Sequence, residues 1–270
     1  MKLNRVIIIM VVLFSFTSCT DVVDVNVPTG KERLVIEASI DWVKGTQGNL
    51  QQIKLSNSTP YFAKNTENPV TNAEVKVVNT NDGAEFVFQH SVNGLYTTSN
   101  FIPVLNDSYS LEISYNGNMY AAEETLLSVT EITKIEQTSE NGFNLDDSEV
   151  RIYFNDPSGV ENYYLAQFKS NQTSIPYLET LKDEFVDGNQ NFIEYEDSNI
   201  GTQLNIRLYG ISETYYNYMT LLIQQNQSDG VFQTIPSALI GNCKNVNDPK
   251  EEVLGYFRLS EVDKTNHTIQ

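Results

Sequence analysis

Histidine is scarce in this chain of 270 residues, and that scarcity narrows the chemistry it can support. The two histidines are His90 and His267. A paired zinc site or a Ser-His-Asp arrangement therefore has little to draw on. The sequence also lacks a Gly-x-Ser-x-Gly run, a phosphate-binding loop and the glycine pattern of dinucleotide sites. We expect no enzymatic activity, no catalytic residues and no cofactor.

Basic residues are also few. Seventeen Lys and Arg stand against 35 Asp and Glu, which gives a formal charge of −18. So acidic a surface repels phosphates and anionic headgroups, and it attracts basic partner faces only weakly and in a salt-dependent way. We expect a solvated surface and no nucleic-acid partner.

The apolar run near the start is too short to cross a membrane. It extends from Val6 to Phe16, follows two basic residues and ends at the small residues Thr17 and Ser18. A spanning helix needs about 20 apolar residues, whereas a secretory signal has this charged start and short apolar centre. Residues 1–18 are therefore predicted to be a signal peptide.

The window Phe16-Thr17-Ser18-Cys19 resembles the bacterial lipobox, although Phe16 replaces the usual aliphatic residue. We predict that Cys19 is acylated and becomes the first residue after cleavage, with ordinary secretion as the alternative. Residues 19–30 form the predicted lipid anchor and tether, because the segment is polar and ends with Pro28 and Gly30. A flexible coil of this length spans roughly 20 Å, so the body should lie close to the bilayer.

Cysteine is limited to Cys19 and Cys243. With Cys19 acylated, no disulfide can form within the mature monomer. Cys243 stands in Gly241-Asn242-Cys243-Lys244-Asn245, which has the composition of a loop. We expect a buried, inert thiol, and a reactive or intermolecular thiol is the alternative.

From Leu34 onward, short apolar or alternating runs are separated by turn residues, a pattern typical of strands. These runs cover residues 34–40, 52–55, 74–79, 85–89, 109–115, 119–122, 149–154, 162–168 and 203–208. Asn81-Asp82-Gly83 and Asn116-Gly117 can supply the positive φ angles of tight hairpins. Turn signals recur about every 8 to 14 residues, which favours a β-sandwich.

One segment departs from this pattern. Ser212-Glu213 can cap a helix, and apolar positions then recur at spacings of three and four through Ile223. We predict the main helix near residues 212–226. Residues 182–199 are polar and acidic, and we interpret them as a long loop or hairpin.

The pattern changes after Leu127 and leads into Gly142-Phe143-Asn144, which we interpret as a seam between domains. The predicted fold is mainly β, with two β-sandwich-like domains over residues 31–128 and 129–270. The first is expected to be immunoglobulin-like or carboxypeptidase-regulatory-like, because Tyr96 after a turn can fill the core as similar residues do in such folds.

Carboxylates are plentiful, and two kinds of site use them. Glu194 and Glu196 would share one strand face, but such a pair is expected by chance among 35 acids, so we do not infer a glycosidase. The oxygen ligands that Ca²⁺ prefers occur in two runs, Asp146, Asp147, Asn155 and Asp156, and Asp183 with Asp187. Neither run has EF-hand spacing, so solvated loops and no metal are expected.

Aromatic residues suggest contact surfaces, because Tyr combines apolar area with a polar tip. The candidates are Tyr163, Tyr164, Tyr177, Tyr195, Tyr215, Tyr216, Tyr218 and Trp42. We expect most of them in the core or at its rim.

The order of these features resembles the DUF4249 family of Bacteroidota lipoproteins, a group named for its unknown function. The resemblance spans most of the mature chain. It rests on Leu34-Val35-Ile36-Glu37, Pro69-Val70-Thr71-Asn72-Ala73-Glu74-Val75, Asp82-Gly83, Asn93-Gly94-Leu95-Tyr96, Tyr109-Ser110-Leu111, Asp183-Glu184-Phe185-Val186-Asp187-Gly188, Leu208-Tyr209-Gly210-Ile211-Ser212 and Gly255-Tyr256-Phe257. The last three carry most weight, and the family pattern gives no role to Cys243.

The resemblance implies an outer-membrane lipoprotein that works beside a TonB-dependent receptor of the kind carrying a carboxypeptidase-regulatory-like domain. We therefore expect a non-enzymatic accessory subunit that docks on such a β-barrel and helps to capture a ligand. It would be lipid-anchored, on the periplasmic face or the cell surface. The alternative is a freestanding surface protein that binds a glycan, a peptide or a metal ion. The resemblance assigns no ligand-binding residue.

Overall fold

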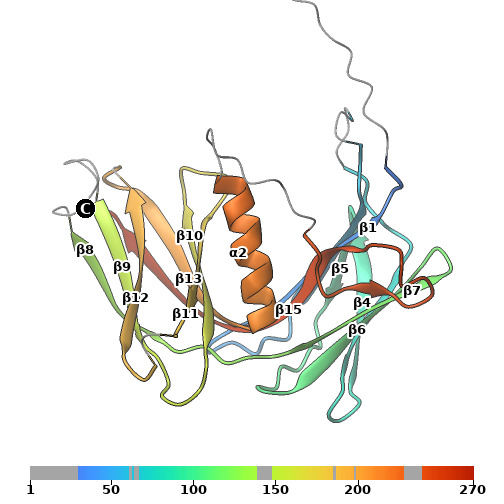
Figure 1. The fold of residues 1–270 in the computed structure, drawn as a ribbon, viewed down its shortest axis with the longest axis horizontal. Coiled ribbons are helices and arrows are strands. Elements are labelled where there is room, and N and C mark those ends of the chain that lie inside the picture. The colour runs from blue at the N-terminus through green and yellow to red at the C-terminus, as the bar shows by residue number, and fades with distance from the viewer. Residues whose placement is uncertain are drawn as a thin grey trace, which may run out of the picture. The chain divides into compact units, whose positions relative to one another are not determined.

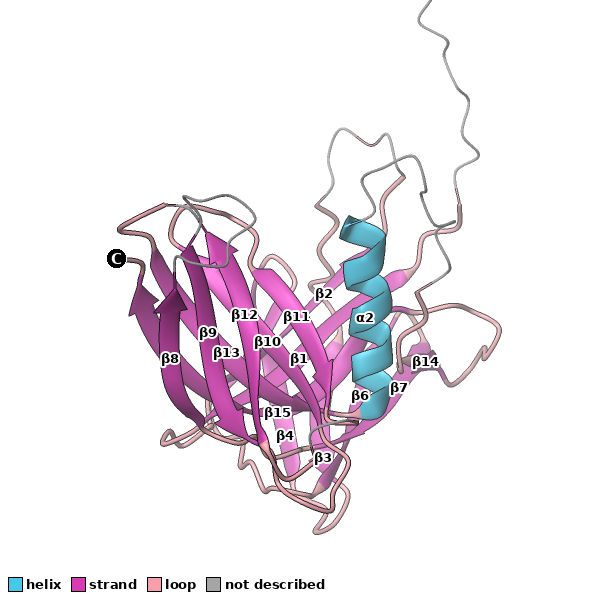
Figure 2. Ribbon diagram, turned by 60° about the vertical axis from the view of Figure 1, so that its left-hand side comes forward, coloured by secondary structure: helices cyan, strands magenta, loops and turns pink. Residues whose placement is uncertain are grey.

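The computed structural model describes residues 30–60, 63, 67–138, 148–184, 187–197, 199–227 and 239–270. The chain divides into two units, Met1–Lys31 and Glu32–Gln270, and every described helix and strand lies in the second. Strands dominate that unit, and helix α2 (Glu213–Gln227) lies beside them (Figure 1; Figure 2). The mainly β, sandwich-like fold with a main helix near 212–226 is confirmed. Among the described residues, no helix has the length and apolar character needed to cross a bilayer.

The strands form one sheet of 12 and one of three. In chain order they are β1 (Leu34–Val43), β2 (Gln51–Asn57), β3 (Glu74–Asn79), β4 (Glu85–Val92), β5 (Leu95–Thr98), β6 (Ser108–Tyr115), β7 (Asn118–Thr125), β8 (Ile132–Thr138), β9 (Ser148–Asn155), β10 (Tyr163–Ser170), β11 (Tyr177–Lys182), β12 (Gln190–Asp197), β13 (Gln203–Ile211), β14 (Lys244–Asn245) and β15 (Leu254–Thr268). The large sheet has the order β11-β10-β13-β15-β1-β2-β5-β4-β3-β6-β7-β14, and the small one has the order β12-β9-β8.

The first core forms because β4 pairs with different strands along its length. Residues 85–88 of β4 pair with β3, whereas Gln89, His90 and Val92 pair with β5. This switch places β1, β2 and β5 on one side of a common core and β3, β6 and β7 on the other. Alternate residues such as Ile36, Ile53 and Leu111 point into it and are at most 1% exposed.

The last strand joins the first one. β15 pairs in parallel with β1 from Val35↔Leu254 to Val43↔Val262, and it pairs antiparallel with β13 further along. Gly255 permits the close approach, because its φ is +92° and an added Cβ would lie 2.0 Å from the Ile36 carbonyl oxygen.

A second core lies among β9, β10, β12 and β13. Its largest contributors include Phe154 and Phe168, both at most 1% exposed, with Ile206 at 0%. Leu126 belongs to the first core and Val129 to the second. The boundary between residues 128 and 129 stays a prediction, and the proposed seam at Gly142-Phe143-Asn144 lies outside the described residues.

Helix α2 covers a third apolar cluster. Tyr215 and Met219 pack with Tyr209 of β13 and with Tyr256 and Val262 of β15. Ser212 caps the helix as predicted, since its Oγ accepts a hydrogen bond from the Tyr215 N–H at 3.2 Å.

The predicted strands are all present, with ends shifted by up to three residues. The interpretation of residues 182–199 as a long loop or hairpin is wrong for Gln190–Asp197, which form β12 and pair with β9. Gln190, Glu194 and Glu196 are exposed, and Ile193 alone among Phe192–Glu196 is buried. With so few buried positions, the alternation of apolar and polar residues in this segment is weak. The short β5 and most of the 15-residue β15 were also missed.

Candidate functional site

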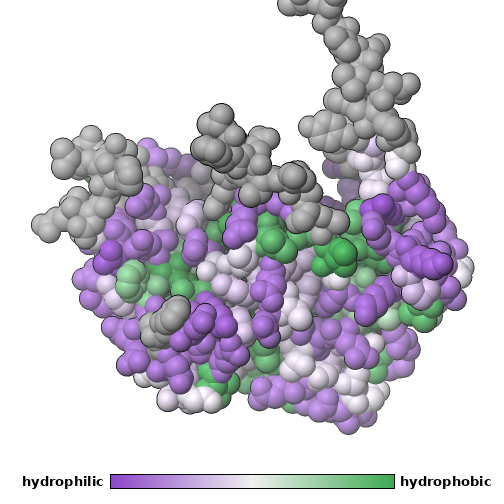
Figure 3. All heavy atoms as spheres, viewed as in Figure 1, coloured by the Kyte–Doolittle hydropathy of each residue, from purple (hydrophilic) through white to green (hydrophobic). Residues whose placement is uncertain are grey.

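A groove of about 900 Å³ lies between α2 and the edge of the large sheet at β7 and β14. It is lined by Ala121, Ala122, Glu123, Thr214, Asn217, Tyr218, Leu221, Leu239, Ile240, Gly241, Asn242, Lys244, Asn245, Val246, Pro249 and Tyr256. Figure 3 shows apolar side chains gathered between α2 and the segment that leads to β14. We call this surface the helix groove.

The walls of the helix groove are fixed by local structure. Thr214, Tyr218 and Leu221 recur at spacings of four and three, so they share one face of α2. On the other wall, the Asn242 side chain donates to the Phe257 carbonyl at 2.8 Å and accepts from its N–H at 2.9 Å. Gly241 is required there, because a Cβ would lie 1.7 Å from the Gly255 carbonyl oxygen. Close backbone packing therefore fixes the position of this wall of the groove.

Several apolar side chains in the helix groove face solvent. Leu221 is 45% exposed, Val246 57% and Ile240 73%. Contiguous exposed apolar surface marks contact sites for partners more often than scattered single residues do. Sequence reasoning missed these residues. Ile240 offered a signal, since it is a large apolar side chain directly before a loop-like pentapeptide.

A partly buried carboxylate stands between α2, β7 and β15. Glu124 Oε2 accepts from Ser212 Oγ at 2.8 Å and from the Tyr256 hydroxyl at 3.4 Å. The Tyr256 hydroxyl also lies 3.0 Å from Thr214 Oγ1. Burial raises the pKa of Glu124, and the hydrogen bonds from Thr125, Ser212 and Tyr256 only partly oppose it. This network ties the start of α2 to β7.

The structure combines the two acidic runs that the sequence suggested as calcium ligands. Carboxylate oxygens of Asp156, Asp183 and Asp187 all lie within 4.8 Å of one another. Asp156 and Asp183 are 5% and 2% exposed, whereas Asp187 is exposed. Asp146 and Asp147 lie outside the described residues, and Asn155 lies at the end of β9. These oxygens have the chemistry that a hard cation prefers.

Hydrogen bonds from other parts of the protein to these three carboxylates give the cluster a role in stabilising the fold. Asp183 accepts from the Asn162 N–H at 2.8 Å, and Asp187 accepts from the Gly159 N–H at 2.7 Å. Asp156 accepts from the Tyr164 hydroxyl at 2.6 Å. The three carboxylates therefore tie together the loops after β9 and β11. We assign them this structural role, and the expectation of no metal stays a prediction.

Most of the singled-out aromatic residues belong to the protein interior. Tyr163, Tyr164 and Tyr215 are buried, and Tyr195 stacks on Phe168 at 5.2 Å. Tyr177 is 37% exposed, and Tyr218 lines the helix groove. Tyr216 packs on Tyr163 at 5.2 Å, and Trp42 donates from Nε1 to the Thr46 carbonyl at 2.9 Å. Tyr218 is therefore the member of this set placed at the groove.

The remaining candidates have different outcomes. Cys243 is 5% exposed, and burial raises the pKa of its thiol to about 12, as expected for an inert cysteine. His90 packs edge-on against Tyr96, whereas His267 lies 3.1 Å from Gln137. Glu194 and Glu196 are both exposed on β12. Residues 1–18 and Cys19 lie outside the described residues.

Comparisons with known proteins complete this description. No curated protein matches the chain. A two-domain fibronectin type-III segment of chicken tenascin shares 11% identity over 59% of this chain and 83% of its own, with a TM-score of 0.23. The chicken CNTN1 FN1–FN3 domains share 8% identity over 68% and 59%, with a TM-score of 0.28. A DUF4785 family protein from Legionella pneumophila shares 12% identity over 65% and 52%, with a TM-score of 0.26.

TM-scores this low do not support an inference about function. The family model described as "Domain of unknown function (DUF4249)" matches residues 20–266, nearly the whole length that follows the predicted signal peptide. The chain belongs to the DUF4249 family.

Proposed function

We propose that this protein is a non-enzymatic outer-membrane lipoprotein of Bacteroidota that acts as an accessory subunit of a TonB-dependent β-barrel receptor and helps to capture its ligand. Cys19 is the acylated residue, and residues 20–30 tether the β body near the membrane. The observation that carries the proposal is the exposed apolar helix groove, on a chain whose first 19 residues resemble a lipoprotein signal.

The helix groove supports docking of a partner segment of defined chemistry. Its exposed Leu221, Ile240 and Val246 favour apolar side chains, because burying them removes apolar surface from water. The lining contains one acidic residue, Glu123, and one basic residue, Lys244, so its formal charge is zero. We therefore infer that the receptor contributes a mainly apolar segment.

A pull-down from native outer membranes tests the proposal. The untagged lipoprotein is captured in mild detergent, its intact mass is measured, and co-purifying proteins are identified by mass spectrometry. We expect an acylated chain together with a TonB-dependent barrel. Recovery of the acylated chain alone would replace the accessory role with that of a freestanding binding protein.

A matched pair of variants tests the docking surface. Ile240→Asp places a charge in the helix groove, whereas Ile200→Asp places one at an equally exposed isoleucine outside it, since these residues are 73% and 78% exposed. We expect Ile240→Asp to lose the barrel and Ile200→Asp to retain it. Equal recovery of the barrel by both variants would exclude this groove as the docking site.

The anchor has its own test. Cys19→Ala should abolish incorporation of labelled palmitate and release the protein from the membrane fraction. Labelling that persists in this variant would move the acylated residue elsewhere.

A further inference from the structure

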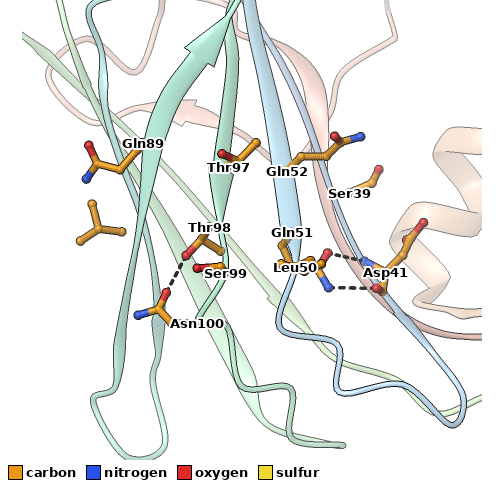
Figure 4. A pocket seen from close by; sticks show the side chains of 11 residues that line it. Ser39, Asp41, Leu50, Gln51, Gln52, Gln89, Thr97, Thr98, Ser99 and Asn100 are labelled. Atoms are coloured by element: carbon orange, nitrogen blue, oxygen red, sulfur yellow. Dashed lines mark hydrogen bonds between the residues drawn. The ribbon is translucent and has the colours of Figure 1, made fainter.

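A second groove, of about 750 Å³, has a lining that shares no residue with the helix groove. Figure 4 shows its floor, which crosses β1, β2, β5 and β4. The lining consists of Ser39, Asp41, Leu50, Gln51, Gln52, Val87, Gln89, Thr97, Thr98, Ser99 and Asn100. Eight of these side chains are uncharged and polar, and one is acidic. We call this surface the sheet groove.

The sheet groove lies where β1 and β2 stop pairing. Their ladder ends at Glu37↔Lys54, although β1 continues to Val43 beside β15. The Gln51 side chain bridges the opening, donating to the Asp41 carbonyl at 2.9 Å and accepting from the Asp41 N–H at 3.2 Å (Figure 4). The backbone at Asp41 is therefore satisfied without closing the groove.

Alternation along β1 sends two polar side chains into the groove. Ala38 and Ile40 are fully buried in the first core, so Ser39 and Asp41 point to the opposite face. In the neighbouring strands, Gln52 pairs with Thr97, and Thr97 pairs with Gln89. The result is a row of amides and hydroxyls across four strands.

Behind Asp41 lies a buried cation. Arg258 is 5% exposed, and its Nη2 donates to Asp41 Oδ1 at 2.6 Å. The guanidinium lies 4.8 Å from the Tyr209 ring centroid and 5.4 Å from that of Tyr215. Its Nε and Nη1 have no hydrogen-bond partner among the described residues. Burial of a guanidinium with unmade hydrogen bonds is costly, and the Asp41 carboxylate and the two tyrosine rings offset this cost only in part.

The lining narrows the class of ligand. It contains no Lys or Arg, so phosphates and carboxylates lack a partner there. The charge of Asp41 is balanced by Arg258, so the groove does not select a strongly basic ligand. Amides and hydroxyls both donate and accept hydrogen bonds, and sugar hydroxyls do the same. Leu50 and Val87, 73% and 50% exposed, offer apolar contact for the C–H faces of sugar rings.

We propose that the sheet groove binds a short neutral glycan, with Asp41 as a hydrogen-bond acceptor at its β1 end. Gln52, Gln89 and Thr97 contact further hydroxyls across the strands. Arg258 is a positioning residue, since it fixes the Asp41 carboxylate from behind and does not reach the ligand. This inference deepens the proposed function, because it names the class of ligand that the accessory subunit captures.

The test uses the purified full chain in detergent, without a receptor. Binding is measured against neutral glucan, xylan, mannan and galactan oligosaccharides, with oligogalacturonate and an uncharged extended peptide as comparison arms. We expect at least one neutral oligosaccharide to bind and oligogalacturonate not to bind. Binding by none of the neutral glycans, or by the peptide alone, would overturn the proposal.

Variants locate the site. Asp41→Asn and Gln89→Ala should each weaken glycan binding, by roughly tenfold for a charge-assisted contact and severalfold for a neutral one. Glu37→Gln, on the same face of β1 but outside the lining, is the matched control. Gln89 is exposed, so its variant keeps the test valid if Asp41→Asn fails to fold. Unchanged affinity in Gln89→Ala and in a folded Asp41→Asn would place any glycan site elsewhere.

The role of Arg258 has a separate readout. Arg258→Met should weaken glycan binding in the native chain and bring no further loss in the Asp41→Asn background, because it acts through Asp41. An additional loss of glycan affinity in that background would mean that Arg258 does not act through Asp41 alone. Asp41→Asn should leave recovery of the barrel unchanged, so failure of the glycan proposal and failure of the accessory role are distinguishable.

Discussion

The regions before and after Leu127 build their interiors differently. In the strands from β1 to β7, the buried polar side chains are the uncharged Gln51, Asn79 and Thr98. The later strands and loops bury charged groups, among them Glu149, Asp156, Asp183, Arg258 and Glu261. The first region therefore relies on apolar alternation, and the second adds buried polar networks to it.

The difference reflects two ways in which the sequence specifies which residues are buried. Alternation places core residues by local periodicity, whereas a buried carboxylate is tolerated only when distant groups satisfy it. Asp183, for example, needs the Asn162 N–H, and Asp156 needs the Tyr164 hydroxyl. The later region is thus more sensitive to the loss of single polar partners.

Large truncations in the two cores provide the strongest test of this contrast. Phe257 of β15 is 0% exposed in the first core, and Phe154 of β9 is 0% exposed in the second. Phe257→Ala and Phe154→Ala should each reduce the free energy of unfolding by about 3–5 kcal/mol. Urea unfolding followed by fluorescence measures both. Because β15 pairs with β1 and β13, we expect one shared transition, and two separate transitions would show that the regions unfold independently.

The acidic cluster gives a smaller effect confined to the later region. Asp183→Ala leaves the Asn162 N–H without its acceptor and should reduce the free energy of unfolding by about 1–3 kcal/mol. Asp187→Ala removes an exposed member of the same cluster and should cost less. Thermal unfolding of both variants checks this order. Equal losses would contradict the importance of burial in the cluster.

The pH dependence of stability tests the contacts that Glu124 makes between the two regions. Because burial raises its pKa in the folded state, the folded protein binds this proton more tightly than the unfolded chain. The stability of the native chain relative to Glu124→Gln should be greatest below the ordinary pKa of 4.5 and should fall as the pH rises through the raised value. Unfolding of both proteins between about pH 4 and pH 8 measures the difference.

Glu123→Gln is the control for this experiment, because it removes the exposed neighbouring carboxylate. The same pH-dependent difference in both variants would disprove the role of burial at Glu124.

The smallest effect is expected at Cys243, which tests whether a segment after α2 is packed into the first core. Its thiol is buried and its pKa is raised to about 12, so a thiol reagent at neutral pH should label almost none of the folded protein. Denaturant should make labelling complete. Rapid labelling of the native chain would mean that this segment is not packed as described.

Sequence reasoning predicted the local elements and missed the long-range ones. Residues 74–79 match β3 at both ends, because the buried Val75 and Val77 alternate with the more accessible Glu74, Lys76 and Val78. Ser212 identified the helix start through its capping side chain. The segment of β12 was interpreted as part of a long loop or hairpin, because the surrounding acidic residues obscured the single buried residue Ile193. Most of β15 was not predicted as a strand. It lies between two other strands and packs against α2, so its buried residues are consecutive and do not alternate with exposed ones.

The candidate sites divide in the same way. The sequence indicated Asp156, Asp183 and Asp187 as acidic ligands but placed them in two separate runs. Neither groove was predicted. The helix groove joins residues more than 90 positions apart, such as Ala122 and Leu221, and the sheet groove depends on an ion pair between Asp41 and Arg258.

By itself, the sequence determined the β class, the strand and turn positions of the first region, the capped helix and the family, because these depend on periodicity and short motifs. The tertiary structure alone decided that β15 lies beside β1, that β1 and β2 separate after Glu37, and that Arg258 stands behind Asp41. The β1–β15 pairing and the Asp41–Arg258 contact join residues more than 200 positions apart, and no local pattern specifies which distant strand will pair with a given edge or which distant residue will neutralise a given charge.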